Sequence, residues 1–444
     1  MAQLGVFEDV HDAIDAAWAA QKELMENYTT DDRDRFIAKI KERFLEIIDE
    51  ETINEFNETG YGRLDQKLIK NRESISGAMD TSCLQPKIMA SSRGLTVEYQ
   101  APYGLVGALT PVTNGIVTVA NNAMDMIAAG NSIVFNAHPA AKLAGAMAVD
   151  LVNQAVIECG GPANLATMCK DPDKASLDVI MYSPKVDLLI GTGGHQMVEM
   201  IMAAPKKVLA AGPSNPPVIV DETADVDLAA ETLFGNVAFE NGMLCVEEKV
   251  GFVVESVYDQ FMAKMAECGA RILTAEEAQK VVDLALIKLD DGTYAANKKY
   301  VGKDANVILK DAGVEPCDYD LQVALIEADK DHPYVAVEQL QPIFPVVKVA
   351  DFEEAMELAV KAEAGCRHTA VIWSNDINRI TLFGKKIGTT TYVANGASVA
   401  AAGVGGTGYG SATIATGTGE GYTTPVSFTR VRRFAFAQGQ GYII

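Results

Sequence analysis

One cysteine of this chain follows a glycine in a segment that could present a thiol to a substrate. Residues 239–248 read FENGMLCVEE, with Gly242 three positions before Cys245. A thiolate adds to an sp² carbon such as that of a carbonyl group, and a flexible neighbouring backbone lets that carbon approach. The N–H of the same cysteine can then donate to the developing oxyanion. Cys245 is therefore a candidate nucleophile, and a small buried hydrophobic residue is the alternative interpretation.

Two distant segments carry polar groups that suit the same chemistry. Residues 108–115 read ALTPVTNG, so the amide of Asn114 follows an apolar run that is broken by a proline. Residues 337–346 read VEQLQPIFPV and contain Glu338, and a glycine-rich run extends from Gly403 to Gly421. An asparagine before a glycine often caps a turn, which is the structural alternative for Asn114.

In this order and spacing, the segments resemble the aldehyde dehydrogenase superfamily. The closer resemblance is to its CoA-acylating branch, the acetaldehyde and propionaldehyde dehydrogenases of bacterial microcompartments that process ethanolamine and propanediol. The resemblance runs from about Gly5 to the last residue. It implies that the Cys245 thiolate adds to an aldehyde, that Asn114 and the Cys245 N–H hold the oxyanion, and that hydride passes to NAD. The acyl group of the resulting thioester is then transferred to the thiol of coenzyme A.

The acceptor of the acyl group is indicated by the absence of acidic residues from one segment. Hydrolytic aldehyde dehydrogenases carry a glutamate on the strand that corresponds to residues 207–212, where it activates the deacylating water. Residues 206–217 read KKVLAAGPSNPP and contain no carboxylate. Water therefore has no obvious general base there, and Asp221 and Glu222 lie too far along the chain to replace it. We expect acyl-CoA as the product, not the free acid.

A histidine and three glutamates complete the predicted catalytic region. His368, in the sequence GCRHT, resembles the His-Thr pair of acylating enzymes and could act on the CoA thiol or the departing thiolate. A structural histidine with satisfied hydrogen bonds is the alternative. Glu338 loosely resembles the family's ribose-binding glutamate. Glu247 and Glu248 would raise the pKa of a nearby thiol, so we expect them to point away into structural pairs.

Further residues implied in cofactor binding end strand-like segments at one edge of a predicted sheet, where such folds bind ligands. Residues 191–194 read GTGG, although such glycines often only turn a strand into a helix. Where hydrolytic members usually place a lysine, this chain reads NAHP, as the acylating branch does, which leaves NAD and NADP both open. The implied cofactor residues are Thr110, Pro111, Asn136, His138, Pro139, Thr192, Gly193, Gly194, Ala211, Gly212 and Glu338.

Strand-like and helix-like segments alternate along most of the chain, which predicts parallel sheets covered on both faces. The expected fold is α/β and aldehyde dehydrogenase-like, with two Rossmann-like domains and a β-strand arm. Asp31 is the expected cap of a helix at 31–48, whose stripe is Phe36, Ile40, Phe44 and Ile48. A helix-rich stretch continues to about Ala90. Other expected helices span 8–28, 117–129, 142–158 and 195–203, and expected strands span 95–99, 105–109, 132–136, 187–190, 207–211, 218–220, 250–254, 346–349 and 370–373.

The domain boundaries are placed at the Gly-Pro-rich breaks. Residues 1–93 and 103–213 are the predicted cofactor-binding domain, and 214–424 the catalytic domain. Residues 94–102 and 425–444, with Arg430, Arg432 and Arg433 on an alternating strand, form the predicted oligomerisation arm. A lone subunit would leave these strands with unpaired edges, so we expect a homo-oligomer, a dimer or tetramer.

Composition excludes several classes of protein. The chain has 444 residues and a formal net charge of −23, which repels nucleic acid and anionic membranes. Its seven cysteines show no CxxC spacing, so neither a disulfide scaffold nor a metal site is expected. No secretory signal or run of 18 apolar residues is present, which favours a cytosolic enzyme, inside a microcompartment by resemblance. Shell or core enzymes would then be partners, and the family's targeting peptide was either removed or is lacking here.

Three alternatives remain beside the acylating dehydrogenase. A hydrolytic aldehyde dehydrogenase is disfavoured by the carboxylate-free segment. A thiolase-like acyltransferase also uses Cys and His with CoA but needs no nicotinamide, so absorbance near 340 nm distinguishes it. A non-catalytic microcompartment scaffold is disfavoured by the intact Cys245, Asn114 and His368.

Overall fold

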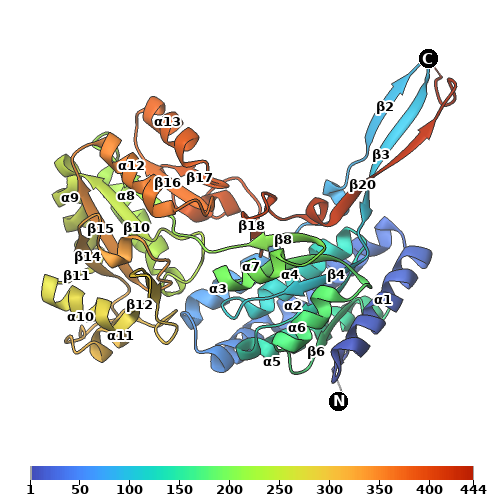
Figure 1. Ribbon diagram of the computed structural model, residues 1–444, viewed down its shortest axis with the longest axis horizontal. Helices are drawn as coiled ribbons and strands as arrows, with labels where there is room; N and C mark the ends of the chain where they lie inside the picture. The colour runs from blue at the N-terminus through green and yellow to red at the C-terminus, as the bar shows by residue number, and fades with distance from the viewer. Residues whose placement is uncertain (1–2, 444) are drawn as a thin grey trace. The chain divides into compact units, whose positions relative to one another are not determined.

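The computed structural model describes residues 3–443, apart from the side chain of His195. The chain forms two compact units, each built around one parallel β-sheet (Figure 1). Unit 1 comprises Met1–Thr59, Leu68–Ala211 and Gly410–Ile444, and unit 2 comprises Gly60–Lys67 and Gly212–Tyr409. The predicted α/β fold with parallel sheets is confirmed.

The sheet of unit 1 has six strands in the order β1-β6-β5-β4-β7-β8, and every neighbouring pair is parallel. Strands β4 and β5 are buried along their whole length, which explains their continuous apolar sequences. The strands are β1 (Val6–Phe7), β4 (Leu105–Leu109), β5 (Ser132–Asn136), β6 (Ala166–Cys169), β7 (Val186–Thr192) and β8 (Lys207–Ala211).

Helices cover both faces of this sheet because successive strand residues point to opposite sides. Val106 and Ala108 of β4 lie in one core with α2, α4 and α5, whereas Leu105 and Leu109 lie in another with α1, α6 and α7. The helices are α1 (Val10–Asn27), α2 (Thr30–Thr59), α4 (Gly115–Ala128), α5 (Lys142–Glu158), α6 (Lys174–Tyr182) and α7 (His195–Met202), with short turns η1 (Thr81–Cys83), η2 (Pro139–Ala141) and η6 (Pro425–Phe428).

Helix α2 begins one residue earlier than predicted and is capped by a different residue. The N–H and hydroxyl of Thr29 both donate to the carboxylate of Asp32 at 2.7 Å, and the Asp32 N–H returns a longer bond to the Thr29 hydroxyl. These reciprocal hydrogen bonds between Thr29 and Asp32 cap the N-terminus of α2. The predicted cap, Asp31, instead lies inside the first turn. The predicted stripe is confirmed, since its four apolar residues are all buried.

One helical stretch of the described residues, Pro139–Glu158, is apolar and long enough to cross a membrane, with 61% of it buried inside the protein. Its apolar residues lie in the core beside α2 and α4, as in a core helix.

The arm is a three-stranded antiparallel sheet in the order β2-β3-β20. Its strands are β2 (Lys87–Ser91), β3 (Gly94–Pro102) and β20 (Thr429–Phe436). Lys87–Ser91 is therefore a strand, where the sequence predicted a helix-rich stretch. The two predicted strands also pair with each other, from Thr429 opposite Pro102 to Phe436 opposite Leu95, so they are not left unpaired by a lone subunit. Among the described residues, no further strand pairs with the outer edges of β2 and β20.

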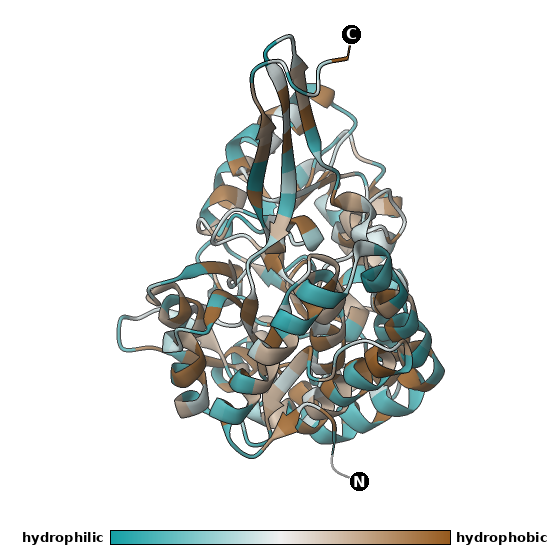
Figure 2. Ribbon diagram, turned by 90° about the vertical axis from the view of Figure 1, so that its right-hand side faces the viewer, coloured by the Kyte–Doolittle hydropathy of each residue, from teal (hydrophilic) through white to brown (hydrophobic). Residues whose placement is uncertain are grey.

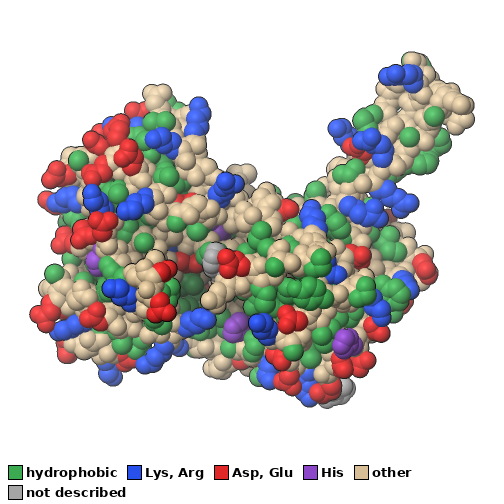
Figure 3. Space-filling view, viewed as in Figure 1, with side chains coloured by type: hydrophobic (Ala, Val, Ile, Leu, Met, Phe, Trp, Pro, Cys, Tyr) green, Lys and Arg blue, Asp and Glu red, His purple; other side chains and the backbone are tan. Residues whose placement is uncertain are grey.

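Apolar side chains nevertheless remain exposed on the arm. Ile88, Val431 and Phe434 are 63%, 61% and 50% exposed. Hydrophobic segments alternate with hydrophilic ones along its strands (Figure 2), and apolar and basic side chains mix on its surface (Figure 3). Exposed apolar surface of this kind indicates a contact surface.

The sheet of unit 2 has seven parallel strands in the order β11-β14-β15-β10-β9-β16-β17. These are β9 (Pro217–Val220), β10 (Val250–Val254), β11 (Arg271–Ile272), β14 (Ala324–Ala328), β15 (Ile343–Val349), β16 (Thr369–Trp373) and β17 (Thr391–Ala394). Helices α8 and α9 cover one face, whereas α12 and α13 cover the other.

The remaining elements of unit 2 extend this sheet. Helices α10 and α11 share a core with β14. The bounds are α8 (Val226–Ala238), α9 (Glu255–Glu267), α10 (Ala275–Ala285), α11 (Ala305–Asp311), α12 (Phe352–Glu363) and α13 (Ile377–Ile387), with η3 (Phe239–Asn241), η4 (Pro333–Val335), η5 (Ser398–Ala402) and the hairpin β12 (Leu286–Lys288) and β13 (Tyr294–Ala296). Helix α3 (Leu64–Ser76) begins in unit 2 and continues in unit 1.

The contacts group some segments differently from the predicted division. Residues 410–424, which include β18 (Ile414–Ala415) and β19 (Gly421–Tyr422), group with unit 1, as does the arm. Residues 60–67 group with unit 2. The assignment of cofactor binding to one domain and catalysis to the other stays a prediction.

Candidate active site

The turn before Cys245 has an unusual backbone that depends on Gly242. Glu240, Asn241 and Gly242 have φ of 49°, 59° and 68°, so three successive residues are left-handed. A Cβ at Gly242 would lie 2.7 Å from the carbonyl oxygen of Gln341. Glycine is therefore required here by a close backbone approach as well as by its φ.

The two non-glycine residues of the turn are held by buried side-chain contacts. The Glu240 carboxylate accepts the Arg63 N–H at 3.0 Å and lies 3.3 Å from the ammonium of Lys67. The Asn241 amide donates to the carbonyl of Gly302 at 3.0 Å and to Asp304 at 2.9 Å. These contacts offset the cost of the left-handed conformation, which is of the order of 1 kcal/mol or more per residue.

A buried lysine supports the cysteine turn from the other side. Lys249, whose side chain is 1% exposed, donates to the carbonyls of Gly242 at 2.6 Å and Leu244 at 2.9 Å. Its ammonium lies 3.8 Å from Glu247, whose carboxylate accepts the Leu244 N–H at 3.0 Å. Glu248 accepts the Ser398 N–H at 2.9 Å and also bonds Asn236. Glu247 and Glu248 are thus held in structural contacts, as predicted, but the charge of Glu247 still contributes to raising the pKa of the Cys245 thiol.

The Cys245 thiol is protonated at rest. The residue is partly exposed, but enough protein surrounds its sulfur that desolvation raises the pKa of the thiol to about 12. The Glu338 carboxyl adds to this rise, whereas the Lys249 ammonium opposes it. A nucleophilic role therefore requires that the thiol lose its proton during the reaction.

Ser214 connects Glu338 to the Cys245 backbone. Its hydroxyl oxygen lies 2.6 Å from the Cys245 carbonyl oxygen and 2.8 Å from Glu338 Oε1. Burial raises the pKa of Glu338, although bonds from Ser214 and the charge of Lys249 oppose the rise. The structure thus brings two of the predicted site residues, Cys245 and Glu338, to one network within unit 2.

His368 is buried with one ring nitrogen unsatisfied. Its backbone N–H donates to Glu363 at 2.9 Å, and Nδ1 lies 2.9 Å from the hydroxyl of Thr369. Nε2 has no hydrogen-bond partner among the described residues. Burial, together with the Lys249 charge, lowers the pKa of His368 to about 4, so the ring is neutral near pH 7. An unpaired buried nitrogen is costly and does not fit a purely structural histidine.

The remaining predicted cofactor residues of unit 1 lie along one edge of its sheet. Strands β5, β4, β7 and β8 are consecutive neighbours and parallel, so their carboxyl ends meet at the same edge. These ends are followed or formed by Thr110, Pro111, Asn136, His138, Pro139, Thr192, Gly193, Gly194 and Ala211, whereas Gly212 begins the second segment of unit 2.

Contacts at this edge differ between the predicted residues. The Asn136 side chain accepts from the Ser176 hydroxyl at 2.7 Å and donates to the Asp173 carbonyl, so it supports the start of α6. Gly194 caps α7 without any side-chain bond, and a Cβ there would meet no atom within 4 Å. Gly194 therefore leaves space beside the backbone at the start of α7, where a phosphate group could approach.

Asn114 stands at the N-cap of α4, yet its side chain makes no capping hydrogen bond. It belongs to unit 1, as do the residues at the sheet edge. The turn-capping alternative for Asn114 is therefore not realised.

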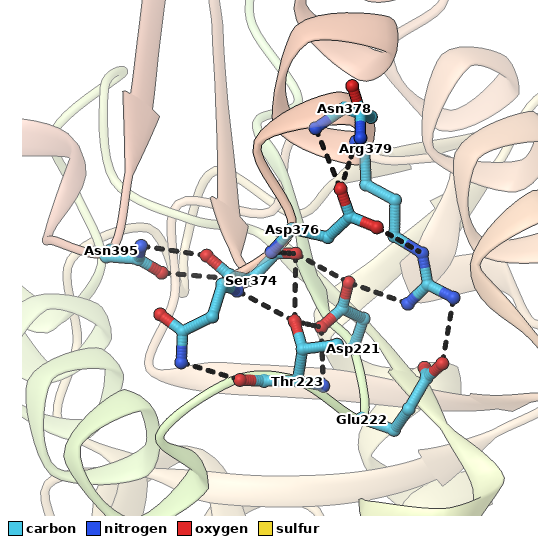
Figure 4. Close-up of polar contacts among 9 residues, drawn as sticks. Asp221, Glu222, Thr223, Ser374, Asp376, Asn378, Arg379 and Asn395 are labelled. Carbon is cyan, nitrogen blue, oxygen red and sulfur yellow. Dashed lines mark hydrogen bonds and ion pairs between the residues drawn. The ribbon is translucent and has the colours of Figure 1, made fainter.

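Asp221 and Glu222 are committed to a structural cluster at the end of β9 (Figure 4). Asp221 accepts from the Thr223 N–H and hydroxyl at 2.8 and 2.6 Å, from the Ser374 hydroxyl at 2.7 Å and from Arg379 at 3.0 Å. Burial alone would raise the pKa of Asp221, but these bonds hold it below its usual range. Arg379 also pairs with Glu222 at 2.8 Å. Both carboxylates are thus engaged by partners within this cluster. No group of His, Cys, Asp and Glu within the described chain could hold a metal ion.

Comparison with known proteins identifies the family. The aldehyde dehydrogenase family model matches residues 2–427. The chain belongs to the aldehyde dehydrogenase family. It is 38% identical to the acetaldehyde dehydrogenase (acetylating) EutE of Escherichia coli (strain K12) over 433 residues, which is 97% of this chain and 92% of the relative.

Two solved structures of this family are closely similar. One is the Rhodopseudomonas palustris propionaldehyde dehydrogenase with bound CoA and an acylated cysteine, with a TM-score of 0.94, 35% identity and 98% coverage of each chain. The other is a propionaldehyde dehydrogenase from the Clostridium phytofermentans fucose utilisation bacterial microcompartment, with a TM-score of 0.95, 34% identity and coverage of 99% of this chain and 100% of that one.

Sequence reasoning missed two residues that build the cysteine turn. Ser214 lies inside the segment 206–217, which was read only for its lack of carboxylates, and Lys249 directly follows the two glutamates. A lysine next to Glu247 and Glu248 in an apolar segment was the available signal, since a buried carboxylate needs a cationic or donor partner.

Proposed function

We propose that this chain is a CoA-acylating aldehyde dehydrogenase. It converts a short-chain aldehyde, acetaldehyde or propionaldehyde, with NAD⁺ and CoA into acyl-CoA and NADH. The observation that carries this proposal is the carboxylate-free segment 206–217 in a chain of the aldehyde dehydrogenase family. The relatives named as acetylating or holding CoA and an acylated cysteine support it.

The first half of the reaction uses Cys245. Its thiol loses a proton and the sulfur adds to the aldehyde carbon, while Asn114 and the Cys245 N–H hold the oxyanion. Glu338, linked to the Cys245 carbonyl through Ser214, helps to hold the turn. NAD⁺ supplies the hydride acceptor when it is bound, and the sheet edge of unit 1, with the open N-terminus of α7, would hold it.

The second half transfers the acyl group from Cys245 to the CoA thiol. His368 is neutral near pH 7, so its imidazole can accept a proton from the incoming thiol or pass one to the departing Cys245 thiolate. Asp221 and Glu222 are held in their cluster with Arg379 and do not activate water. The thioester therefore persists until CoA arrives.

The decisive experiment measures NADH at 340 nm with aldehyde and NAD⁺, with and without CoA, and quantifies acid and acyl-CoA. Acyl-CoA equal to the NADH formed is the expected result. Acid as the main product would favour a hydrolytic dehydrogenase, and acyl transfer without NADH a thiolase-like enzyme. Cys245→Ala is the control for background reduction.

The assembly and location of the enzyme are finer proposals. A homo-oligomer, dimer or tetramer, forms through the arm, whose exposed Ile88, Val431 and Phe434 need cover. The enzyme works in the cytoplasm inside a bacterial microcompartment, beside shell or core enzymes, and the similarity to a microcompartment propionaldehyde dehydrogenase supports this. Co-sedimentation with shell proteins from cells tests the location.

A further inference from the structure

The N-terminus of α4 is capped by a residue from another helix, so that Asn114 has no capping role. Asn114 occupies the N-cap position with φ −144° and ψ 54° and makes no side-chain cap. The Ile116 N–H donates instead to Glu55 Oε1 of α2 at 3.1 Å. A Cβ at Gly115 would lie 3.0 Å from that same oxygen, so the glycine leaves room for the carboxylate.

Two consecutive residues of α3 contact the two side chains at the start of α4: Lys70 contacts Asn114, and Asn71 contacts Glu55. Asn71 is fully buried and donates to Glu55 Oε2 at 3.2 Å and to the Thr52 hydroxyl at 3.0 Å. Lys70 donates from its ammonium to Asn114 Oδ1 at 2.7 Å. All these residues belong to unit 1.

The Lys70 contact fixes which end of the Asn114 amide is offered to a substrate. An ammonium only donates hydrogen bonds, so it selects the amide oxygen and leaves the NH₂ group on the other side. Asn114 Nδ2 lies 3.5 Å from the Thr113 hydroxyl, which is the long limit for a hydrogen bond. The amide is partly exposed, so its N–H groups can donate to an incoming anion.

We propose that Lys70 is a positioning residue that acts through Asn114, orienting and polarising the amide that holds the oxyanion. The ammonium draws electron density toward Oδ1 and makes the Nδ2–H groups better donors. The inference rests on the proposed function, because it takes Asn114 as the oxyanion donor. It adds a residue that precedes Asn114 by 44 positions and that no motif of the sequence singles out.

The test compares Lys70→Met, Lys70→Arg, Asn114→Ala and the double variant Lys70→Met/Asn114→Ala. The readout is the rate of the first NADH turnover at saturating aldehyde and NAD⁺, with the melting temperature of each variant. We expect Lys70→Met to slow this turnover about 10-fold to 100-fold, since misplacing one catalytic group costs up to about 100-fold. Lys70→Arg, which can still donate, should stay within about 3-fold of the wild type.

The double variant separates positioning from other roles. If Lys70 acts through Asn114, the double variant is no slower than Asn114→Ala alone. An equal loss from Lys70→Met in both backgrounds would overturn the proposal, as would a Lys70→Met enzyme with the wild-type rate. Arg72→Met is the matched control, because it removes a positive charge from the same helix, and this charge pairs with Asp49 at the surface.

Failure of the proposed function is distinguishable from failure of this inference. If the proposed function is wrong, the wild-type enzyme forms no CoA-dependent NADH. The role of the Lys70 contact can then still be tested by structure determination. Crystal structures of the wild type and Lys70→Met then decide. The Asn114 amide should keep one rotamer in the wild type and rotate or become mobile in the variant. An unchanged amide would overturn the positioning role.

Discussion

The hydroxyl oxygen of Ser214 lies 2.6 Å from the carbonyl oxygen of Cys245. Ser214 therefore holds the backbone of the candidate nucleophile. The same hydroxyl lies 2.8 Å from Glu338 Oε1. Ser214 has one hydroxyl proton for these two oxygens, and burial raises the pKa of Glu338. The Ser214 hydroxyl is therefore shared between the two oxygens, and it links Glu338 to the Cys245 backbone.

Replacing Ser214 should therefore loosen the turn. We expect Ser214→Ala to lower the free energy of unfolding by about 1–3 kcal/mol, because it removes the hydroxyl that bonds both Glu338 and the Cys245 carbonyl. Glu338→Gln should cost less, since the amide oxygen can still accept from the Ser214 hydroxyl. Urea unfolding measures both, with the exposed Ser76→Ala as control. Equal losses for Ser214→Ala and Ser76→Ala would contradict the network.

Removing the buried lysine should be more severe. Lys249→Met removes the cation beside the buried Glu247 and the donor to the Gly242 and Leu244 carbonyls, and such losses typically reach about 3–5 kcal/mol. The double variant Lys249→Met/Glu247→Gln should recover part of this loss, because the amide oxygen still accepts the Leu244 N–H. A loss below about 1 kcal/mol in Lys249→Met, by urea unfolding, would show that the ion pair is not what supports the turn.

The titration of His368 predicts a pH dependence of stability. Its pKa is about 4 in the folded chain, against about 6.5 for a histidine in an unfolded chain. Between these values the unfolded chain binds more protons, so stability that is present above about pH 6.5 is lost as the pH falls toward 4.

The neutral variant His368→Gln should lack this dependence. We expect the melting temperature of the wild type to fall more steeply from pH 7 to pH 4.5 than that of His368→Gln. His11→Gln, which removes an exposed histidine, should follow the wild type. Parallel curves for wild type and His368→Gln would mean that His368 is not buried as described.

The arm should carry the subunit contact. Val431→Asp with Phe434→Asp places charges on exposed apolar positions of β20, where an interface would bury them without partners. Analytical ultracentrifugation should then show that the variant forms smaller species than the wild type does. The melting temperature of the monomer should not change. Val426→Asp, at an exposed apolar position in η6 before β20 begins, is the control. A concentration-independent wild-type monomer would rule out this role.

Most central strands of the two sheets could be predicted from the sequence, because runs of apolar residues and Gly or Pro breaks mark them, whereas β6, β14 and β17 were not predicted. Strand β8 and helix α5 have the predicted bounds, 207–211 and 142–158. Strand β2 could not be predicted, since all five of its residues are exposed and show no alternation in burial. Its conformation depends on hydrogen bonds to β3, which is a tertiary interaction that no local pattern records.

The residues of the candidate site likewise divide into those that the sequence predicted and those that only the folded structure reveals. Cys245, Asn114 and Glu338 were found from motif order, and the roles of all three stay predictions. Lys70 bonds Asn114, Ser214 bonds Glu338 and the Cys245 carbonyl, and Lys249 bonds the turn before Cys245. Only the folded chain creates these contacts, and Lys70 lies 44 residues from its partner. The Glu55 cap of α4 likewise comes from a helix 61 residues away. Such partners have no fixed spacing from the residue that they support.

The central claim is that acyl transfer from Cys245 needs CoA, and intact-protein mass spectrometry tests it most directly. Enzyme mixed with propionaldehyde and NAD⁺ but no CoA should gain one acyl group per chain at Cys245, form one NADH per site and nearly stop. A missing general base typically slows attack by water about 10²–10⁴-fold. Added CoA should remove the acyl group and restart NADH formation. Continued acid formation without CoA, with no acylated chain accumulating, would contradict the account.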